Sequence, residues 1–299
     1  MKKGIIFAIL ASFVFSIMNA LVKTVSLSIP SSEVVFFRSI IGATITYFMM
    51  RRSKVSFSTK GVPLLLLRGV LGALYLIAYF YTISKIPLAD ASILVHLSPF
   101  FVIILSALIL REKIQPKMYA LLGIVLLGAF LTIKPFNYST YSIYALIGVL
   151  SALFAAGASI TIRHLSKNHH TYEIVFYFLA TAALVSIPMM WNNFVVPTPL
   201  EFFYLLCIGS ISLIGQLFLT KAYTHEKAPI VAVTRHIGIA FNVMWGLLFW
   251  GEVPDILTAL GGIIIIGACI YLTWSKGKEE SKEKSNPSNK QILETRKVT

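Results

Sequence analysis

The chain has 299 residues, of which 57% are hydrophobic and 13% are charged, and its mean hydropathy is +0.81. Soluble domains carry roughly a quarter charged residues, so this composition excludes a soluble protein and predicts an integral membrane protein. The formal net charge of +14 would indicate nucleic-acid binding in a soluble chain. Here the basic residues lie in short segments between apolar runs and in the C-terminal tail, so we expect no nucleic-acid partner.

Ten apolar stretches are long enough to cross a bilayer, where a spanning helix needs about 20 residues and must pair its own backbone groups. In chain order they are residues 4–25, 32–50, 61–84, 88–110, 116–134, 142–164, 171–190, 200–224, 229–250 and 255–275. The first stretch also resembles a signal peptide, but its apolar part from Gly4 to Val22 is longer than a typical signal core. The sequence therefore predicts an all-α integral membrane protein with about ten transmembrane helices.

Basic residues are concentrated on one predicted side of the membrane. With the N-terminus inside, 20 of the 26 Lys and Arg residues fall in inner segments or the tail, and 3 fall in outer segments. The positive-inside rule then predicts a multi-pass protein with both termini cytoplasmic. Residues 276–299 are polar and carry both charges, so we expect a disordered cytoplasmic tail, with lipid binding as the alternative.

The second half of the sequence repeats features of the first at a constant offset of 140 positions. The polar residues that coincide are Lys23 with Arg163, Glu33 with Glu173, His96 with His236, and Glu112 with Glu252. Each half, residues 1–140 and residues 141–275, holds five predicted spans. Because five is odd, the two halves must cross the membrane in opposite senses. Such 5+5 inverted repeats are typical of secondary transporters with a site near the bilayer midplane, so the sequence predicts transport by alternating access.

Several segments resemble a known family. PLADASILVHLSPFFVIILSALILREK (residues 87–113) is similar to the EamA pattern of the drug/metabolite transporter superfamily, with its Leu-Ala-Asp-Ala, mid-span proline and closing glutamate. FWGEVPDILTALGGIIIIGACIYL (residues 249–272) resembles the last two helices of that family. The resemblance covers about residues 1–275 and implies the fold and the transport of small, diverse metabolites.

Details of the second half resemble one branch of this family. Lys221-Ala222-Tyr223, Ala228-Pro229-Ile230 and the Gly-Glu-Val-Pro run at residues 251–254 are similar to riboflavin and S-adenosylmethionine importers. This branch implies a uniporter or exchanger that imports a nucleotide-like metabolite as an alternative function. Thr234-Arg235-His236 departs from the aromatic or proline-containing stretch usual in the ninth helix.

Two histidines within spans are candidates for the substrate site, because ionisable groups are costly in lipid. His96 and His236 approach the midplane from opposite sides of the membrane. They could line the site, carry a coupling proton, or simply bond a neighbouring carbonyl or hydroxyl.

Two arginines within spans are further candidates. Arg235 keeps its charge and needs a carboxylate, an anionic substrate or the membrane surface. Asn242 lies seven residues further on, and so on the same helix face. Arg38 could pair with Glu33, contact a substrate carboxylate or reach the membrane surface.

Aromatic and amide side chains complete the predicted substrate site. Tyr75 and Tyr79 are four residues apart on one helix, and Gln216 lies near the counterpart of Tyr75. Such a lining suits flat or amphipathic metabolites, although aromatic residues also pack structurally. Asn19 could line the site or bond a neighbouring helix.

Other polar residues in the spans have predicted structural roles. We expect Arg68 to reach the membrane surface, and Asp90 to cap the start of the fourth helix. Glu112 and Glu252 lie at helix ends and are predicted to be structural. Pro99 should bend the fourth helix, because it removes a backbone hydrogen bond.

The remaining motifs argue for a transporter over other classes. The chain has no HExxH, GxSxG or P-loop motif and no paired acidic residues within spans, so we expect neither an enzyme nor a metal or cofactor site. The chain also has no sequence that resembles a selectivity filter, so a channel is not indicated. We therefore predict a secondary or facilitative transporter of a small organic metabolite, in contact with the lipid of a bacterial cytoplasmic membrane. Coupling to a proton and formation of a homodimer stay open.

Overall fold

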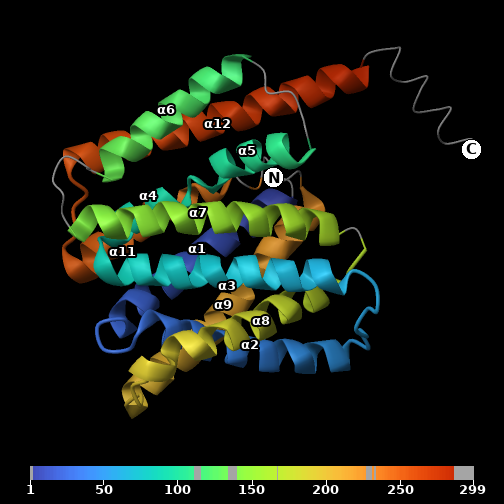
Figure 1. Ribbon diagram of the computed structural model, residues 1–299, viewed down its shortest axis with the longest axis vertical. Coiled ribbons are helices and arrows are strands. Elements are labelled where there is room, and N and C mark those ends of the chain that lie inside the picture. The colour runs from blue at the N-terminus through green and yellow to red at the C-terminus, as the bar shows by residue number, and fades with distance from the viewer. Residues whose placement is uncertain are drawn as a thin grey trace, which may run out of the picture.

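The computed structural model describes residues 3–110, 116–133, 140–166, 168–226, 231 and 234–285. Within these residues every regular element is a helix, and no β-strand is present. The elements are α1 (Lys3–Val25), α2 (Ser31–Arg52), α3 (Val62–Lys85), α4 (Leu88–Val95), α5 (Ser98–Leu110), α6 (Pro116–Ile133), α7 (Thr140–Leu165), α8 (Thr171–Met190), η1 (Trp191–Asn193), α9 (Pro199–His225), α11 (Ile237–Trp250) and α12 (Ile256–Ser285). Figure 1 shows a helical bundle with α6 and α12 packed side by side along one edge.

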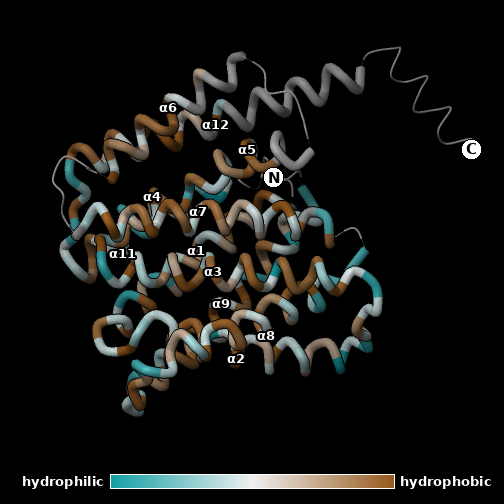
Figure 2. Tube along the Cα trace, viewed as in Figure 1, coloured by the Kyte–Doolittle hydropathy of each residue, from teal (hydrophilic) through white to brown (hydrophobic). Residues whose placement is uncertain are grey.

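Six helices of the described chain are long and apolar enough to cross a membrane, namely α1, α2, α3, α7, α8 and α9. Shorter apolar helical stretches fall within the other four predicted spans, at Leu88–Val102, Gly123–Ile133, Ile237–Trp250 and Ile256–Ala268. Figure 2 shows hydrophobic residues along most of these helices.

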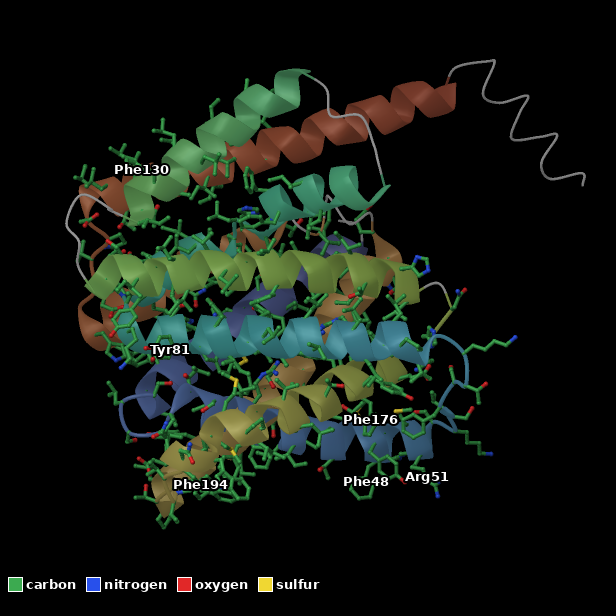
Figure 3. All side chains as sticks on the ribbon, viewed as in Figure 1. Phe48, Arg51, Tyr81, Phe130, Phe176 and Phe194 are labelled. Carbon is green, nitrogen blue, oxygen red and sulfur yellow. The ribbon has the colours of Figure 1, made fainter. Side chains whose placement is uncertain are left out.

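The outside of the bundle is rich in large apolar side chains. Phe48 on α2 is 66% exposed and Phe130 on α6 is 43% exposed, and Figure 3 shows both pointing away from the bundle. Polar side chains such as Asn19 and Ser92 are instead buried. This distribution suits surrounding lipid rather than water and fits a multi-pass membrane protein.

Two of the predicted spans are interrupted near their middle. α4 ends at Val95, His96 and Leu97 form a turn, and α5 begins at Ser98. Pro99 lies in the first turn of α5, where its missing N–H costs little. The predicted bend is therefore confirmed as a full break.

The corresponding predicted span in the second half, residues 229–250, is interrupted as well. Residues 234 and 235 are helical, His236 forms a turn, and α11 begins at Ile237. No proline stands at the corresponding position, which is Ile239. This second break was not predicted from the sequence.

An ion pair joins α1 to the segment after α11. Lys23 Nζ pairs with Glu252 Oε1 and donates a weaker bond to the Ile86 carbonyl at 3.4 Å. The other carboxylate oxygen of Glu252 accepts from the backbone N–H of Leu88 at 2.9 Å, at the start of α4. The structural role predicted for Glu252 is confirmed, whereas Glu112 lies outside the described residues.

The prediction that Asp90 caps the fourth helix is wrong. Pro87 is the N-cap residue of α4, and no side chain caps it. Asp90 lies in the first turn of the helix, and it accepts hydrogen bonds from the Tyr141 hydroxyl and, at 3.5 Å, from the Thr258 hydroxyl. It therefore joins α4 to α7 and α12.

The last helix extends past its predicted end. α12 continues to Ser285, ten residues beyond the predicted span, into the segment expected to be a disordered tail. The added residues are mainly Lys, Glu and Ser, and Lys and Glu form helices well in water. Residues 286–299 of the predicted tail lie outside the described residues.

Candidate functional site

A continuous set of side-chain hydrogen bonds links four helices inside the bundle. Asn19 Nδ2 on α1 lies 3.1 Å from the Tyr79 hydroxyl on α3 and 3.3 Å from Asn242 Oδ1 on α11. Asn242 Nδ2 donates in turn to the Ser92 hydroxyl on α4 at 2.9 Å. All four residues are buried. We refer to Asn19, Tyr79, Ser92 and Asn242 as the polar network.

The two helix breaks face each other beside this network. The rings of His96 and His236 have centroids 5.3 Å apart. His96 Nδ1 lies 2.7 Å from the Ser92 carbonyl oxygen, and His96 Nε2 lies 3.2 Å from the Arg235 carbonyl oxygen. The first break is thus hydrogen-bonded directly to the second. The sequence predicted that the two histidines approach the midplane from opposite sides, and the structure places their rings next to each other.

Both ring nitrogens of His96 face backbone carbonyl oxygens, which can only accept hydrogen bonds. A neutral imidazole has one N–H and can donate to one of these oxygens, whereas an imidazolium can donate to both. With a second ring proton, His96 could therefore donate a hydrogen bond to each of the two carbonyl oxygens.

Arg235 places its side chain next to the same cluster. Its carbonyl oxygen accepts from His96, while its half-buried guanidinium lies close enough to Tyr75 and Tyr79 to interact with them electrostatically. Tyr75 and Tyr79 stack, with ring centroids 5.8 Å apart and planes 13° from parallel. An aromatic face and a fixed cation thus border the polar network.

Arg38 and Arg68 are both buried, which corrects two predictions. Arg38 does not pair with Glu33, whose Oε2 instead accepts from the Val195 N–H at 3.0 Å. Residues five apart lie on different faces of a helix, so this ion pair was geometrically unfavourable from the start. Neither arginine reaches the surface, since Arg38 is 1% and Arg68 is 4% exposed. The predicted snorkelling of both side chains is wrong.

Gln216 is not connected to the polar network. It is buried on α9, and its backbone carbonyl accepts from the Thr220 hydroxyl. In the part of the chain that the structure describes, no hydrogen bond joins the Gln216 side chain to the other predicted site residues.

Sequence reasoning missed Ser92, which takes part in the site, and a hydrogen bond between Trp245 on α11 and Ser16 on α1, the helices that carry Asn242 and Asn19. Ser92 connects Asn242 to His96, and the Trp245 indole N–H donates to the Ser16 hydroxyl at 3.0 Å. Helical spacing could have identified them, because Ser92 lies one turn before His96 and Trp245 lies one turn after Asn242.

A separate pocket of about 620 Å³ lies at one end of the bundle. It is lined by residues 26–32, by Tyr81, Ser84 and Lys85 at the end of α3, and by residues 193–195. Figure 3 shows Tyr81 and Phe194 at the end of the molecule opposite Arg51.

The site brings several kinds of polar and aromatic group together. It combines amide and hydroxyl groups, stacked tyrosines and a guanidinium, which can orient a polar metabolite with a flat or anionic part. Among the described residues, no three His, Cys, Asp or Glu side chains gather to hold a metal ion.

Known proteins similar to this chain are membrane transporters. The chain is 61% identical over 277 residues to the pseudopaline exporter CntI of Pseudomonas aeruginosa, across 92% of this chain and 98% of that protein. It is 26% identical to the riboflavin transporter of Rhizobium johnstonii, across 93% of each. It is also 26% identical to the S-adenosylmethionine uptake transporter of Rickettsia bellii, across 85% of this chain and 87% of that protein.

A solved crystal structure shares the fold. It has a TM-score of 0.62 and 18% sequence identity, and the match covers 91% of this chain and 98% of that chain.

The sequence model of the EamA-like transporter family matches the chain twice, at residues 2–134 and at residues 142–274. The resemblance seen in residues 87–113 and 249–272 is thereby confirmed. The named relatives transport metabolites, which confirms the prediction that the protein is a transporter and not an enzyme. The chain belongs to the EamA-like transporter family.

Proposed function

We propose that this protein is a secondary transporter that exports pseudopaline or a closely related metabolite across a bacterial cytoplasmic membrane. The observation that carries the proposal is the 61% identity to a named pseudopaline exporter over 98% of that protein. The relatives from Rhizobium johnstonii and Rickettsia bellii, named as riboflavin and S-adenosylmethionine transporters, are each only 26% identical to this chain. Import of a nucleotide-like metabolite is therefore not favoured.

In this proposal the halves 1–140 and 141–275 are inverted repeats of five spans each. Two observations support it: the family model matches each half once, and each half interrupts a helix at an equivalent histidine. The excess of Lys and Arg on one side supports cytoplasmic termini. Because one chain holds both halves, transport does not require a homodimer.

The proposed substrate site lies where the two broken helices meet. Broken helices expose backbone groups that can bind a substrate, and their two segments can move separately. The residues assigned to this site are Asn19, Arg38, Tyr75, Tyr79, His96, Arg235, His236 and Asn242. Gln216 is assigned to packing, because no hydrogen bond connects it to the polar network.

His96 is the proposed carrier of a coupling proton. The support is its position between two carbonyl oxygens, which only the protonated ring can satisfy together. Export would then be driven by a proton moving into the cell as the metabolite leaves.

Inside-out membrane vesicles test the direction and the coupling together. Vesicles that contain the protein should take up pseudopaline with saturable kinetics, and faster when the vesicle lumen is acidic. Vesicles with the His96→Gln variant should respond less to the pH gradient, since glutamine cannot take up a proton. Uptake that rises linearly with concentration would favour a channel. Uptake that is absent from inside-out vesicles but present in right-side-out vesicles would favour an importer.

A further inference from the structure

Two buried arginines face a single phenylalanine ring inside the bundle. The guanidinium carbon of Arg38 on α2 lies 5.7 Å from the centre of the Phe178 ring on α8, and that of Arg68 on α3 lies 4.2 Å from it. Their separation cannot exceed the sum of these two distances. Two fixed positive charges therefore lie close together in the membrane-spanning part of the protein.

Among the described residues, neither guanidinium has a partner of opposite charge. Nε and Nη1 of both Arg38 and Arg68 are buried without a hydrogen-bond partner. The carboxylates on the same helices bond to other groups: Glu33 on α2 accepts from the Val195 N–H, and Glu173 on α8 accepts from Ser58. The described part of the chain thus provides no counter-ion for the pair.

Such an arrangement is unfavourable for the protein alone. Arginine remains charged under all physiological conditions, and burial of an unpaired charge costs far more than contact with an aromatic face returns. The two charges also repel each other. An anion bound between them would remove both penalties.

A glycine allows Arg68 to occupy this position. A Cβ atom on Gly72 would lie 2.2 Å from Arg68 Nη1 and 2.6 Å from the Phe178 ring, so an added side chain would force the guanidinium or the ring to move. The guanidinium of Arg68 therefore lies directly over the Gly72 backbone. Helix α3 thus holds the charge against Phe178, inside the bundle.

Arg38 is already assigned to the proposed substrate site, and Tyr75 connects the arginine pair with the rest of that site. Tyr75 lies three residues after Gly72 and interacts electrostatically with Arg38, Arg68 and Arg235. It also stacks on Tyr79 of the polar network. A ligand in that network could therefore extend one end past Tyr75 towards the two arginines.

We propose that Arg38 and Arg68 form an anion site that binds a carboxylate group of the transported metabolite. This inference rests on the proposed function, because it assigns the site to the exported compound. A carboxylate can accept two parallel hydrogen bonds from one guanidinium, which suits the free donors of both residues. A resident inorganic anion, such as phosphate or chloride, has the same neutralising chemistry and is distinguished by the test below.

Ligand-dependent thermal stability of the full-length protein in lipid nanodiscs tests the site. The variants are Arg38→Gln and Arg68→Gln, with Arg51→Gln as the matched control, since Arg51 lies on α2 but is exposed. Pseudopaline should raise the Tm of the wild type and of the control. Both buried variants should bind it at least about tenfold more weakly. Their Tm without ligand should be equal to or higher than that of the wild type, because an unpaired buried charge has been removed.

A milder pair of variants preserves the charge. Arg68→Lys keeps the cation but cannot form two parallel bonds, so its affinity should fall between those of the wild type and Arg68→Gln. Gly72→Ala should displace the guanidinium and weaken binding while leaving both arginines in the chain.

The outcomes separate this inference from the proposed function. If Arg38→Gln and Arg68→Gln lower the Tm and bind pseudopaline normally, the arginine site is wrong and the exporter proposal stands. If pseudopaline has no effect on any protein while succinate gives an arginine-dependent shift, the site stands and the proposed substrate is wrong. If only phosphate or chloride gives an arginine-dependent shift, the assignment to a substrate carboxylate is wrong.

Discussion

Asn242 is the residue through which the polar network connects the two halves of the protein. It accepts from Asn19 on α1 and donates to Ser92 on α4. Because Asn242 is 3% exposed, water cannot replace either bond if the amide is removed. Its substitution therefore changes both the site and the stability of the bundle.

We expect Asn242→Ala to lower the free energy of unfolding by about 1–3 kcal/mol, because it leaves buried polar groups unpaired. Transport affinity should fall as well. Thermal unfolding in detergent and uptake in vesicles measure the two effects. Asn193→Ala is the control, since Asn193 is exposed after α8 and should change neither. Wild-type transport by Asn242→Ala would remove this residue from the site.

A substitution of Arg235 can separate the role of its side chain from the role of its backbone carbonyl group. Its carbonyl oxygen bonds to His96, so Arg235→Ala removes the guanidinium and leaves that bond in place. We expect normal insertion and stability but about tenfold or more weaker substrate affinity, as for loss of one partner in a buried charge contact. Exposed Arg52→Ala is the control. Equal apparent KM values for Arg235→Ala and the wild type would contradict the assignment.

For single residues, the sequence predicted which side chains belong to the candidate site more successfully than it predicted their contacts. The rarity of charged groups within spans identified His96, His236 and Arg235, which the structure brings together. Arg68 was misjudged because its position on α3 does not reveal that Phe178, from another helix, covers its guanidinium. Such contacts depend on tertiary packing, which a single sequence does not encode locally.

The two helix breaks are the elements that distinguish this bundle from simple spans. α5 begins beside Pro99, and the break leaves room for His96 to reach the Arg235 carbonyl group. Proline in a helix interior costs about 3 kcal/mol, so the residue favours a break at this point. Two short segments can move relative to each other more easily than one continuous helix.

Pro99→Ala should therefore make α4 and α5 more continuous. We expect a higher Tm and a lower maximal transport rate, since the protein gains helix stability and loses mobility at the break. Thermal unfolding and initial uptake rates check both changes. A variant with lower Tm and unchanged transport would show that Pro99 only contributes packing.

The contact between Lys23 and Glu252 connects α1, α4 and the end of α11. Glu252→Gln leaves the Lys23 ammonium without its counter-charge, and Lys23 is 8% exposed. We expect a loss of about 2 kcal/mol in unfolding free energy, below the 3–5 kcal/mol typical of fully buried pairs because Glu252 is partly exposed. Chemical denaturation in detergent measures it.

The double variant Lys23→Met with Glu252→Gln gives the matched comparison. It should recover part of the lost stability, because no unpaired charge remains. Additive losses in the two single variants and the double variant would mean that the ion pair contributes nothing.

Helix positions were predictable because a span needs about 20 apolar residues, which hydropathy shows directly. The first break was predictable from Pro99, but the second was not, since Ile239 occupies the corresponding position. There the turn at His236 accompanies the contact of the Arg235 carbonyl with His96 from the other half. The end of α12 was misplaced because Lys- and Glu-rich segments can form helices as well as disordered tails.

For the whole molecule, composition and the internal repeat predicted a membrane transporter, and the family match confirms it. The substrate and the direction of transport could not be predicted. The relatives are named as a pseudopaline exporter, a riboflavin transporter and an S-adenosylmethionine uptake transporter, so similarity to this chain reports the fold rather than the cargo. The substrate depends on a small number of side chains around the polar network and the arginine pair.

Counterflow in proteoliposomes that contain only the purified protein tests the central claim most directly. Liposomes are preloaded with unlabelled pseudopaline, and labelled pseudopaline is added outside at low concentration. An alternating-access transporter of this compound should accumulate the label transiently above its external concentration, and Arg235→Ala should reduce that peak. No accumulation above the external concentration, with the protein correctly inserted, would contradict the account.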